Sequence, residues 1–373
     1  MIYLDYAANT PVREEVLTTF CEVSRAYSAN PNSHHTLGRQ AGEKLTACTR
    51  HMLTLLAATD REMIYTSGAT EANNLAIKGA AHQYRGRGKH ILTTYLEHSS
   101  VHGAIGALQA EGYEVEYVDL LPNGQVDITH LQSLLRQDTV LVSVCYVDSE
   151  LGIIQDIDSI GRLLSSHPNC LFHVDVTQAA GKFPLALAHA DLVCFAPHKF
   201  YGLNGIGALI KKPEVLLETQ IHGGASTTQY RSGSPALALI ASMDTALSLA
   251  YADMEANNRY VQALNARLRQ VLGQYPDVAM NSPQGASAYL LNVSVPGRDA
   301  SAILQALEQK GFCLSGKSAC TAPKAVSRPV YALTKSRRMA LSTLRISISH
   351  LTTAADIEGF LAAFDVCYQE NGR

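Results

Sequence analysis

The sequence lacks a long uncharged apolar run. No segment reaches the roughly 18 apolar residues that a membrane-spanning helix needs. The first residues, MIYLDYAANTP, contain neither the basic region nor the apolar stretch of a secretory leader. We therefore expect a soluble, cytoplasmic protein that makes no contact with a membrane.

A large excess of one charge is also missing. The 30 Lys+Arg and 33 Asp+Glu give a formal net charge of -3, which argues against a surface built to attract nucleic acid or anionic lipid. The eight cysteines include no CxxC pair, and His34 and His35 have no matching ligand spacing. The sequence therefore predicts no disulfide framework, no metal site and no direct nucleic-acid binding, and any functional cysteine is expected to be a single reactive thiol.

Hydrophobic residues make up 47% of the 373 residues, enough for two or three ordinary domains. Between about residues 60 and 210, short β-rich segments alternate with helix-like stretches. The β-rich segments are EMIYT, HILTT, EVEYV, VLVSVCY, LFHVD, DLVCF and IGALI. The pattern predicts an α/β fold with a mostly parallel seven-stranded sheet covered on both faces. Helices are expected at residues 71–81, 100–111, 128–136 and 156–166.

The pattern changes after Ser234 and Pro235. Apolar residues at spacings of three and four predict one long helix, which continues to about Leu272 and bridges two domains. The tail alternates again, with strands expected at AYLLNVSV, FCLSG and LRISIS and helices near residues 300–310 and 353–368. We expect a large α/β domain at residues 14–255 and a smaller α+β domain formed by residues 1–13 and 256–373.

Three segments place polar groups where open α/β sheets bind ligands. Lys199 follows a strand in FAPHKFYGLNGIGAL, although a lysine there is often only a solvated charge. Asp175 ends the strand LFHVD and needs a cationic partner, which a protonated pyridine nitrogen or a basic side chain supplies equally well. In TSGATEANN, a turn at Gly68 opens a helix whose free backbone N–H groups, with the Thr70 hydroxyl, suit a phosphate.

Together these segments resemble the pyridoxal 5'-phosphate (PLP) site of fold-type I enzymes. With YLDYAANTPV, the EH pair, RSGS, SGKSACTA and LRISIS, they follow the order and spacing of the cysteine desulfurases of class V aminotransferase type. The resemblance covers essentially the whole chain. It implies PLP-dependent conversion of L-cysteine to L-alanine, with the sulfur held as a persulfide on Cys320 and passed to an acceptor protein.

The resemblance implies a role for each cofactor residue. Lys199 forms the covalent link to PLP and shuttles protons at the substrate Cα, and Asp175 pairs with the ring nitrogen. His98 stacks on the ring and is a candidate acid–base group. The other expected cofactor-binding residues are Ala69, Thr70, Ser149, Gln178, His198 and Ser234. Ser234 is expected to reach the cofactor of the other subunit, which implies a homodimer.

The resemblance also implies the substrate contacts. Arg345 in LRISIS matches the arginine that grips the α-carboxylate, and Asn30 in SANPNSHH is expected at the substrate entrance. Cys320 in SGKSAC determines the reaction, because it matches the family nucleophile whereas most cysteines in large cytosolic enzymes are inert. The basic run TKSRR is expected to be a solvated face, or a surface for an acidic partner.

Three features depart from the family pattern. Ala196 replaces a serine that contacts the phosphate, so one phosphate hydrogen bond should be missing. Asp148 and Ser149 replace two asparagines, and Asp148 brings a negative charge near the cofactor. Lys317 replaces a glycine in the cysteine loop, where its charge is expected to lower the Cys320 pKa or to contact an acceptor.

Two alternatives stay open. A selenocysteine lyase or a class V aminotransferase has the same scaffold and is distinguished by whether turnover needs Cys320. A non-catalytic scaffold for sulfur transfer would need neither Cys320 nor the predicted cofactor residues. The acceptor pathway is also open, because iron–sulfur cluster assembly, tRNA thiolation and DNA phosphorothioation all draw on this type of enzyme.

Overall fold

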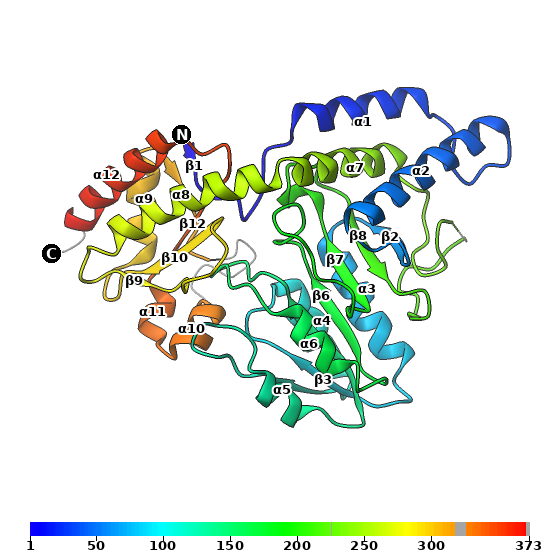
Figure 1. Ribbon diagram of the computed structural model, residues 1–373, viewed down its shortest axis with the longest axis horizontal. Helices are drawn as coiled ribbons and strands as arrows, with labels where there is room; N and C mark the ends of the chain where they lie inside the picture. The colour runs from blue at the N-terminus through cyan, green and yellow to red at the C-terminus, as the bar shows by residue number, and fades with distance from the viewer. Residues whose placement is uncertain (225, 318–325, 371–373) are drawn as a thin grey trace.

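The computed structural model describes residues 1–224, 226–317 and 326–370. Figure 1 shows two regions side by side, one built around a large central sheet and the other around two small sheets. The chain begins and ends in the second region, so the segments at both ends lie beside one another although they are far apart in sequence.

The large sheet has seven strands. Their order across the sheet is β2 (Glu62–Thr66), β8 (Gly207–Lys211), β7 (Leu192–Phe195), β6 (Leu171–Asp175), β5 (Thr139–Cys145), β3 (His90–Thr93) and β4 (Glu114–Tyr117). The strands from β7 to β4 are parallel, whereas β8 is antiparallel to both of its neighbours. Residues 196–206, between β7 and β8, are too few for the crossover that parallel strands require. All seven predicted strand segments form this sheet, which confirms the α/β prediction.

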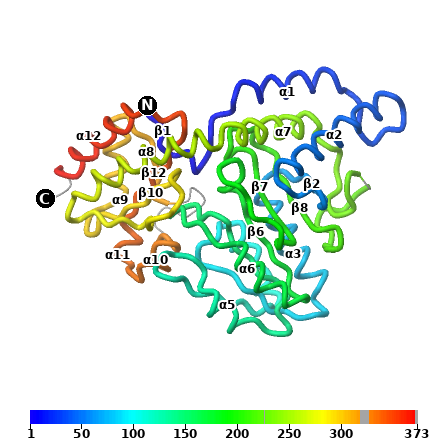
Figure 2. Tube along the Cα trace, viewed as in Figure 1, coloured from blue at the N-terminus to red at the C-terminus, as the bar shows by residue number. Residues whose placement is uncertain are grey.

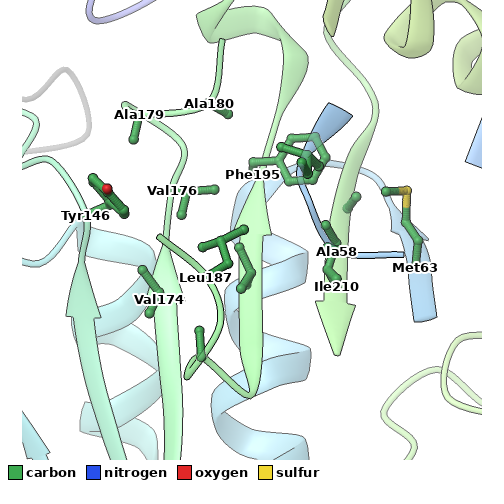
Figure 3. Packing of buried hydrophobic residues seen from close by; sticks show 14 of the residues in the cluster. Ala58, Met63, Tyr146, Val174, Val176, Ala179, Ala180, Leu187, Phe195 and Ile210 are labelled. Atoms are coloured by element: carbon green, nitrogen blue, oxygen red, sulfur yellow. The ribbon is translucent and has the colours of Figure 1, made fainter. Parts of the chain in front are cut away.

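Four helices connect the parallel strands, as the sequence predicts. They are α3 (Ala69–Gln83), α4 (Ser99–Ala110), α5 (Ile128–Leu134) and α6 (Ile157–Leu164). Three further helices, α1 (Glu14–Ala26), α2 (Thr36–Leu55) and α7 (Leu237–Ala252), pack together on one side of the sheet (Figure 2). Figure 3 shows the core beneath them, where Val174, Phe195 and Ile210 from neighbouring strands pack with Met63.

The predicted long bridging helix is wrong in one respect, because the segment forms two helices. These are α7 and α8 (Met254–Leu272), and they are bent by 65° at Asp253. The two helices pack against different cores, since α7 contacts α1 and α2 whereas α8 contacts α12 and β10. The Asp253 carboxylate at the bend lies 3.0 Å from Nη1 of Arg13. Among the described residues no single helix has the length and composition of a membrane span, and only this bent pair together has both.

The second region contains two small sheets. One is antiparallel with the order β12 (Thr343–Ser347), β10 (Leu290–Ser294), β9 (Ala279–Met280), and the other pairs β1 (Ile2–Tyr3) in parallel with β11 (Phe312–Cys313). The helices here are α9 (Ala300–Gln309), α10 (Arg328–Thr334), α11 (Arg337–Leu341) and α12 (Ala354–Glu370). Leu4 shares a buried cluster with Val261, Leu291, Ile346 and Phe360. This core supports grouping the first residues with the tail, while the domain boundaries stay a prediction.

Candidate active site

A cavity of about 310 Å³ lies where several strands of the large sheet end. It is bordered by the carboxyl ends of β5 and β6, the N-termini of α3 and α4, and the short 3₁₀ helix η1 (Pro197–Lys199). Open α/β sheets bind ligands at this edge. The predicted site residues that line the cavity are Ala69, Thr70, His98, Ser149, Asp175, Gln178, His198, Lys199 and Arg345.

Lys199 is held by the N-terminal segment of the chain. Its Nζ donates hydrogen bonds to the carbonyl oxygens of Ala7 at 2.8 Å and Ala8 at 2.6 Å. The lysine ends η1, directly after β7, and this turn directs it toward a segment some 190 residues away. These two neutral carbonyl oxygens therefore hold the amine at the cavity rather than on the solvent face of a loop.

Asp175 is the last residue of β6 and is almost fully buried. Its Oδ2 accepts a hydrogen bond from Nδ2 of Asn73 at 2.8 Å, and its Oδ1 accepts one from the backbone N–H of Thr177 at 2.9 Å. The same Asn73 amide also donates to Ser100 Oγ at 2.9 Å. These donors orient the carboxylate without neutralising it, so it remains suited to a cationic partner in the cavity.

His98 is the N-cap residue of α4 and faces the same cavity. Its Nδ1 accepts a hydrogen bond from the backbone N–H of Ser100 at 3.2 Å. Because a backbone N–H can only donate, Nδ1 carries no proton and the neutral ring is protonated at Nε2. Burial lowers the His98 pKa, and the charge of Lys199 lowers it further, whereas Asp175 opposes the shift. A neutral imidazole is therefore favoured at this position.

The N-terminus of α3 forms the end of the cavity that suits an anion. Ser67, Gly68, Ala69 and Thr70 line it, and the first turn of a helix leaves backbone N–H groups free for an anionic ligand. The neighbouring strand comes very close to this turn, because a Cβ on Gly207 would lie 2.5 Å from the carbonyl carbon of Gly68. Only glycine at position 207 therefore permits this arrangement of strand and turn.

Arg345 reaches the cavity from β12 of the second region. Its Nη2 donates to Oδ1 of Asp5 at 2.7 Å and its Nη1 donates to the carbonyl oxygen of Ser149 at 3.1 Å. Its Nε has no hydrogen-bond partner in the described part of the chain, although it is buried. The guanidinium thus lines the cavity with its Nε–H still available as a hydrogen-bond donor, as a carboxylate-binding group requires.

The turn after β5 contains two of the departures from the family pattern. Ser149 lines the cavity, but the side chain of Asp148 points into its own turn, where it accepts hydrogen bonds from the backbone N–H groups of Glu150 and Leu151. Burial, with the nearby charge of Glu150, raises the Asp148 pKa to about 7. The expected negative charge near the cofactor is therefore directed away from the cavity and weakened by protonation.

Two predicted residues lie outside this cavity. Ser234 is exposed and lines a second, smaller cavity beside Ser67, and Nδ2 of Asn30 donates to its hydroxyl at 3.4 Å. Asn30 is exposed as well. The structure thus brings Asn30 and Ser234 together, but within one chain neither lines the main cavity.

The remaining predictions have mixed outcomes. Cys320 lies outside the described residues, so its placement stays a prediction. Ala196 is fully buried and does not line the cavity. Burial lowers the Lys317 pKa, and Glu150 opposes the shift. In the run TKSRR, Lys335, Arg337 and Arg338 are exposed, as expected of a solvated face.

Several site residues were not predicted. Asn73, Ser67 and Thr177 contact Asp175 or line the cavity. Asn73 lies one helical turn after Ala69, the first residue of α3, so its place near the cavity follows from helix periodicity once the turn is assigned. Asp5 contacts a residue 340 positions away, and no pattern in the sequence indicates that pairing.

Five kinds of chemical group meet at this cavity. A lysine amine, a buried carboxylate, a neutral histidine, a helix N-terminus and an arginine converge from both regions of the chain. Such a set can bind an aromatic cation with an attached anionic group at one end and a carboxylate-bearing substrate at the other.

Comparison with known proteins agrees with this description. The family described as aminotransferase class-V matches residues 2–360. The cysteine desulfurase IscS of Shewanella pealeana is 39% identical over 368 residues, which cover 96% of this chain and 90% of the relative. A solved NifS-like protein has a TM-score of 0.91 at 27% identity and covers 99% of both chains. The solved structure of SspA in complex with cysteine has a TM-score of 0.82 at 27% identity, covering 93% of this chain and 99% of that one. This chain belongs to the class V aminotransferase family and, within it, to the cysteine desulfurases.

Proposed function

We propose that the protein is a PLP-dependent cysteine desulfurase that converts L-cysteine to L-alanine and transfers the sulfur through Cys320 to an acceptor protein. The observation that carries the proposal is the convergence of Lys199, Asp175 and Arg345 on one cavity, in a chain of the cysteine desulfurase family. A non-catalytic scaffold has no need for this convergence.

The residues around the cavity fit PLP. Its volume of about 310 Å³ is at the lower end of the range for small-molecule sites. Asp175 suits the protonated ring nitrogen, and the α3 N-terminus with Ser67 and Thr70 suits the phosphate. The buried Thr177 hydroxyl has no hydrogen-bond partner among the described residues, so a donor is available to a ligand. When bound, PLP supplies an acceptor for the electron pair released at the substrate Cα.

The protein side chains perform the other tasks. Arg345 binds the substrate carboxylate and so orients the Cα–H bond toward Lys199, which takes the proton as a general base. His98, neutral in its buried position, is available to exchange a proton with the substrate. The Cys320 thiolate attacks the substrate sulfur, so that an S–S bond forms, the C–S bond breaks, and the electron pair of that bond leaves with the carbon. Protonation of that carbon yields alanine.

The protein is proposed to act as a homodimer. Ser234 lies outside the main cavity of its own chain, and this placement supports a role in the cavity of a second copy. Mixing a Ser234→Ala chain with a Lys199→Ala chain should then restore activity, because one site of the heterodimer combines an intact Lys199 with an intact Ser234. A fully active monomer in light scattering would contradict this arrangement.

We propose a cytoplasmic location because six of the described cysteines do not pair in disulfides. These six, Cys21, Cys48, Cys145, Cys170, Cys194 and Cys313, are free thiols, and most of them are buried. Free thiols in this number suit a reducing compartment. The acceptor is proposed to be another protein, and the geometry favours none of the three acceptor pathways.

The function is tested by comparing Cys320→Ala with Cys313→Ala. Cys320→Ala should still bind PLP and L-cysteine but release no alanine, whereas Cys313→Ala should keep wild-type turnover. After incubation with ³⁵S-cysteine, trypsin separates the two thiols, because it cuts after Lys317 and Lys324. Reductant-sensitive label is expected on residues 318–324. Full turnover by Cys320→Ala would favour the lyase alternative instead.

A further inference from the structure

Lys182 is a second lysine close to the proposed site, and nothing in the proposed reaction uses it. Only 8% of its surface is exposed. Its Nζ lies 5.6 Å from the centre of the Tyr289 ring and donates a hydrogen bond to Oε1 of Gln178 at 3.2 Å. Within the described ranges no carboxylate forms an ion pair with it. A buried ammonium without a counter-ion is costly, so its retention calls for a reason.

Gln178 separates Lys182 from the main cavity. Gln178 and Ala7 line the main cavity, and they also line a small void that is bordered by Lys182. Nε2 of Gln178 donates to the carbonyl oxygen of Ala7 at 2.9 Å, and that same oxygen accepts from Lys199 Nζ at 2.8 Å. The two lysines are thus connected through one amide side chain and one carbonyl oxygen.

Both neighbours of the amide demand the same orientation. An ammonium can only donate a hydrogen bond, so it requires the carbonyl oxygen of Gln178 on its side. A backbone carbonyl can only accept, so Ala7 requires the amino group on the other side. Rotating the amide by half a turn would lose both hydrogen bonds and bring the amino group of Gln178 against the ammonium of Lys182.

We propose that Lys182 is a positioning residue that locks the Gln178 amide, so that its second N–H is available to an acceptor oxygen of the cofactor in the main cavity. The inference rests on the proposed function, in which that acceptor is the phenolic oxygen of PLP. Without Lys182 the amide can turn, and the group presented to the phenolic oxygen becomes a carbonyl that repels it.

The electrostatic setting limits this role to the charged form of Lys182, because a neutral amine can also accept a hydrogen bond. Burial lowers the Lys182 pKa to about 7, and the charge of Lys199 contributes to the shift. Like charges disfavour one another reciprocally, so a charged Lys182 also opposes a charge on Lys199. Removing Lys182 should therefore alter the electronic state of the bound cofactor as well as its affinity.

The experiment compares Lys182→Met with Lys211→Met. Methionine keeps most of the length of lysine but has neither donor nor charge. Lys211 is the control, because it is also a buried lysine, lies in β8, and has its contacts away from the cavity: an ion pair with Glu62 at 2.7 Å and hydrogen bonds to the carbonyl oxygens of Lys212 and Pro213. Two properties are measured on each protein: the dissociation constant for PLP, and the pH titration of the visible absorption band of the loaded protein.

Lys182→Met should bind PLP roughly tenfold more weakly, as expected for the loss of one hydrogen bond. Its absorption titration should shift to higher pH, because the positive charge and the fixed donor are both lost. Lys211→Met should bind PLP and titrate as the wild type does. Equal PLP affinity and equal titration in Lys182→Met and the wild type would overturn the proposal.

Two further variants separate positioning from packing. If Lys182 acts through Gln178, the double variant Lys182→Met/Gln178→Met should bind PLP as Gln178→Met does, whereas additive losses would contradict the proposal. Lys182→Arg, which keeps a cation that can only donate to Oε1, should retain the wild-type affinity even if Lys182→Met does not fold. Loss of affinity in a folded Lys182→Arg protein would overturn the proposal. A wild-type protein that binds no PLP would refute the proposed function instead.

Discussion

Arg345 and Asp5 form an ion pair between residues 340 positions apart in the sequence, with Nη2 2.7 Å from Oδ1. The arginine side chain is 2% exposed and the aspartate side chain 16%. The other Asp5 oxygen accepts a hydrogen bond from Ser315 Oγ at 2.7 Å. One carboxylate thus holds both the proposed substrate arginine and the segment that leads to the cysteine loop.

Asp5→Ala should destabilise the protein by about 3 kcal/mol, because it leaves a buried guanidinium charge uncompensated. Urea unfolding followed by circular dichroism measures the change. Asp277→Ala is the control, since Asp277 is 61% exposed and lies 3.8 Å from Arg298. Its effect should be much smaller. Equal losses in the two variants would show that burial of the Arg345 pair does not matter.

Gly207→Ala should weaken PLP binding while the large sheet stays folded. The added methyl would lie 2.5 Å from the carbonyl carbon of Gly68, so the turn before α3 would have to shift. Equilibrium dialysis against PLP measures the effect. Gly106→Ala in α4, which meets nothing within 4 Å, should bind PLP as the wild type does. Unchanged binding in Gly207→Ala would mean that this turn does not hold the phosphate.

Asn73→Ala should weaken PLP binding, raising its dissociation constant roughly tenfold to a hundredfold. Its amide donates to the Asp175 carboxylate, and hydrogen bonds to charged groups contribute about 1.5–3 kcal/mol. The neighbouring Asn74 provides the control, because its amide donates to the carbonyl oxygen of Thr70 instead. The rate at which PLP is lost during dialysis distinguishes the two variants. Similar rates would argue against Asp175 as the partner of the cofactor ring.

Glu97 predicts a pH dependence of stability. Burial raises its pKa from 4.5 to about 8, while hydrogen bonds from Cys145 N and Thr94 Oγ1 oppose the shift. Unfolding therefore releases a proton in this window, so the contribution of Glu97 to stability falls as the pH rises from about 4.5 to about 8. Glu97→Gln should remove this decline, and the difference between the urea midpoints of the two proteins should grow with pH. Parallel midpoints across the window would show that Glu97 does not titrate there.

The large sheet could be predicted because its inner strands, from β8 to β3, are buried on both faces. Such strands appear as continuous apolar runs, and residues 139–145 are buried along the whole length of β5. By contrast, α2 escaped prediction because its sequence is mainly polar and only a few of its residues, among them Ala41, Cys48 and Met52, are buried. The bend at Asp253 has no proline or glycine to indicate it, since it arises where α7 and α8 meet different cores.

The site shows a similar division. Lys199, Asp175 and Thr70 lie at strand ends or helix starts, and local patterns with a family resemblance are sufficient to find them. The residues that orient them were missed because their contacts are tertiary. Asp5 reaches Arg345 only after the chain has folded back on itself. Lys182 lies only four residues after Gln178, but its burial depends on Tyr289, more than a hundred residues away.

The position of the first ten residues has a consequence for the order of folding during synthesis. The carbonyl oxygens of Ala7 and Ala8 hold Lys199, while Leu4 pairs with Ser347 near the other end of the chain. The strands of the large sheet all lie between residues 62 and 211, so this sheet can assemble while the ribosome is still adding the tail. The N-terminal segment has partners in the large region, among them Lys199, but its contacts are complete only after β12 has been made. We therefore expect the amine of Lys199 to reach its final environment late, and a prematurely terminated chain to lack the completed amine site.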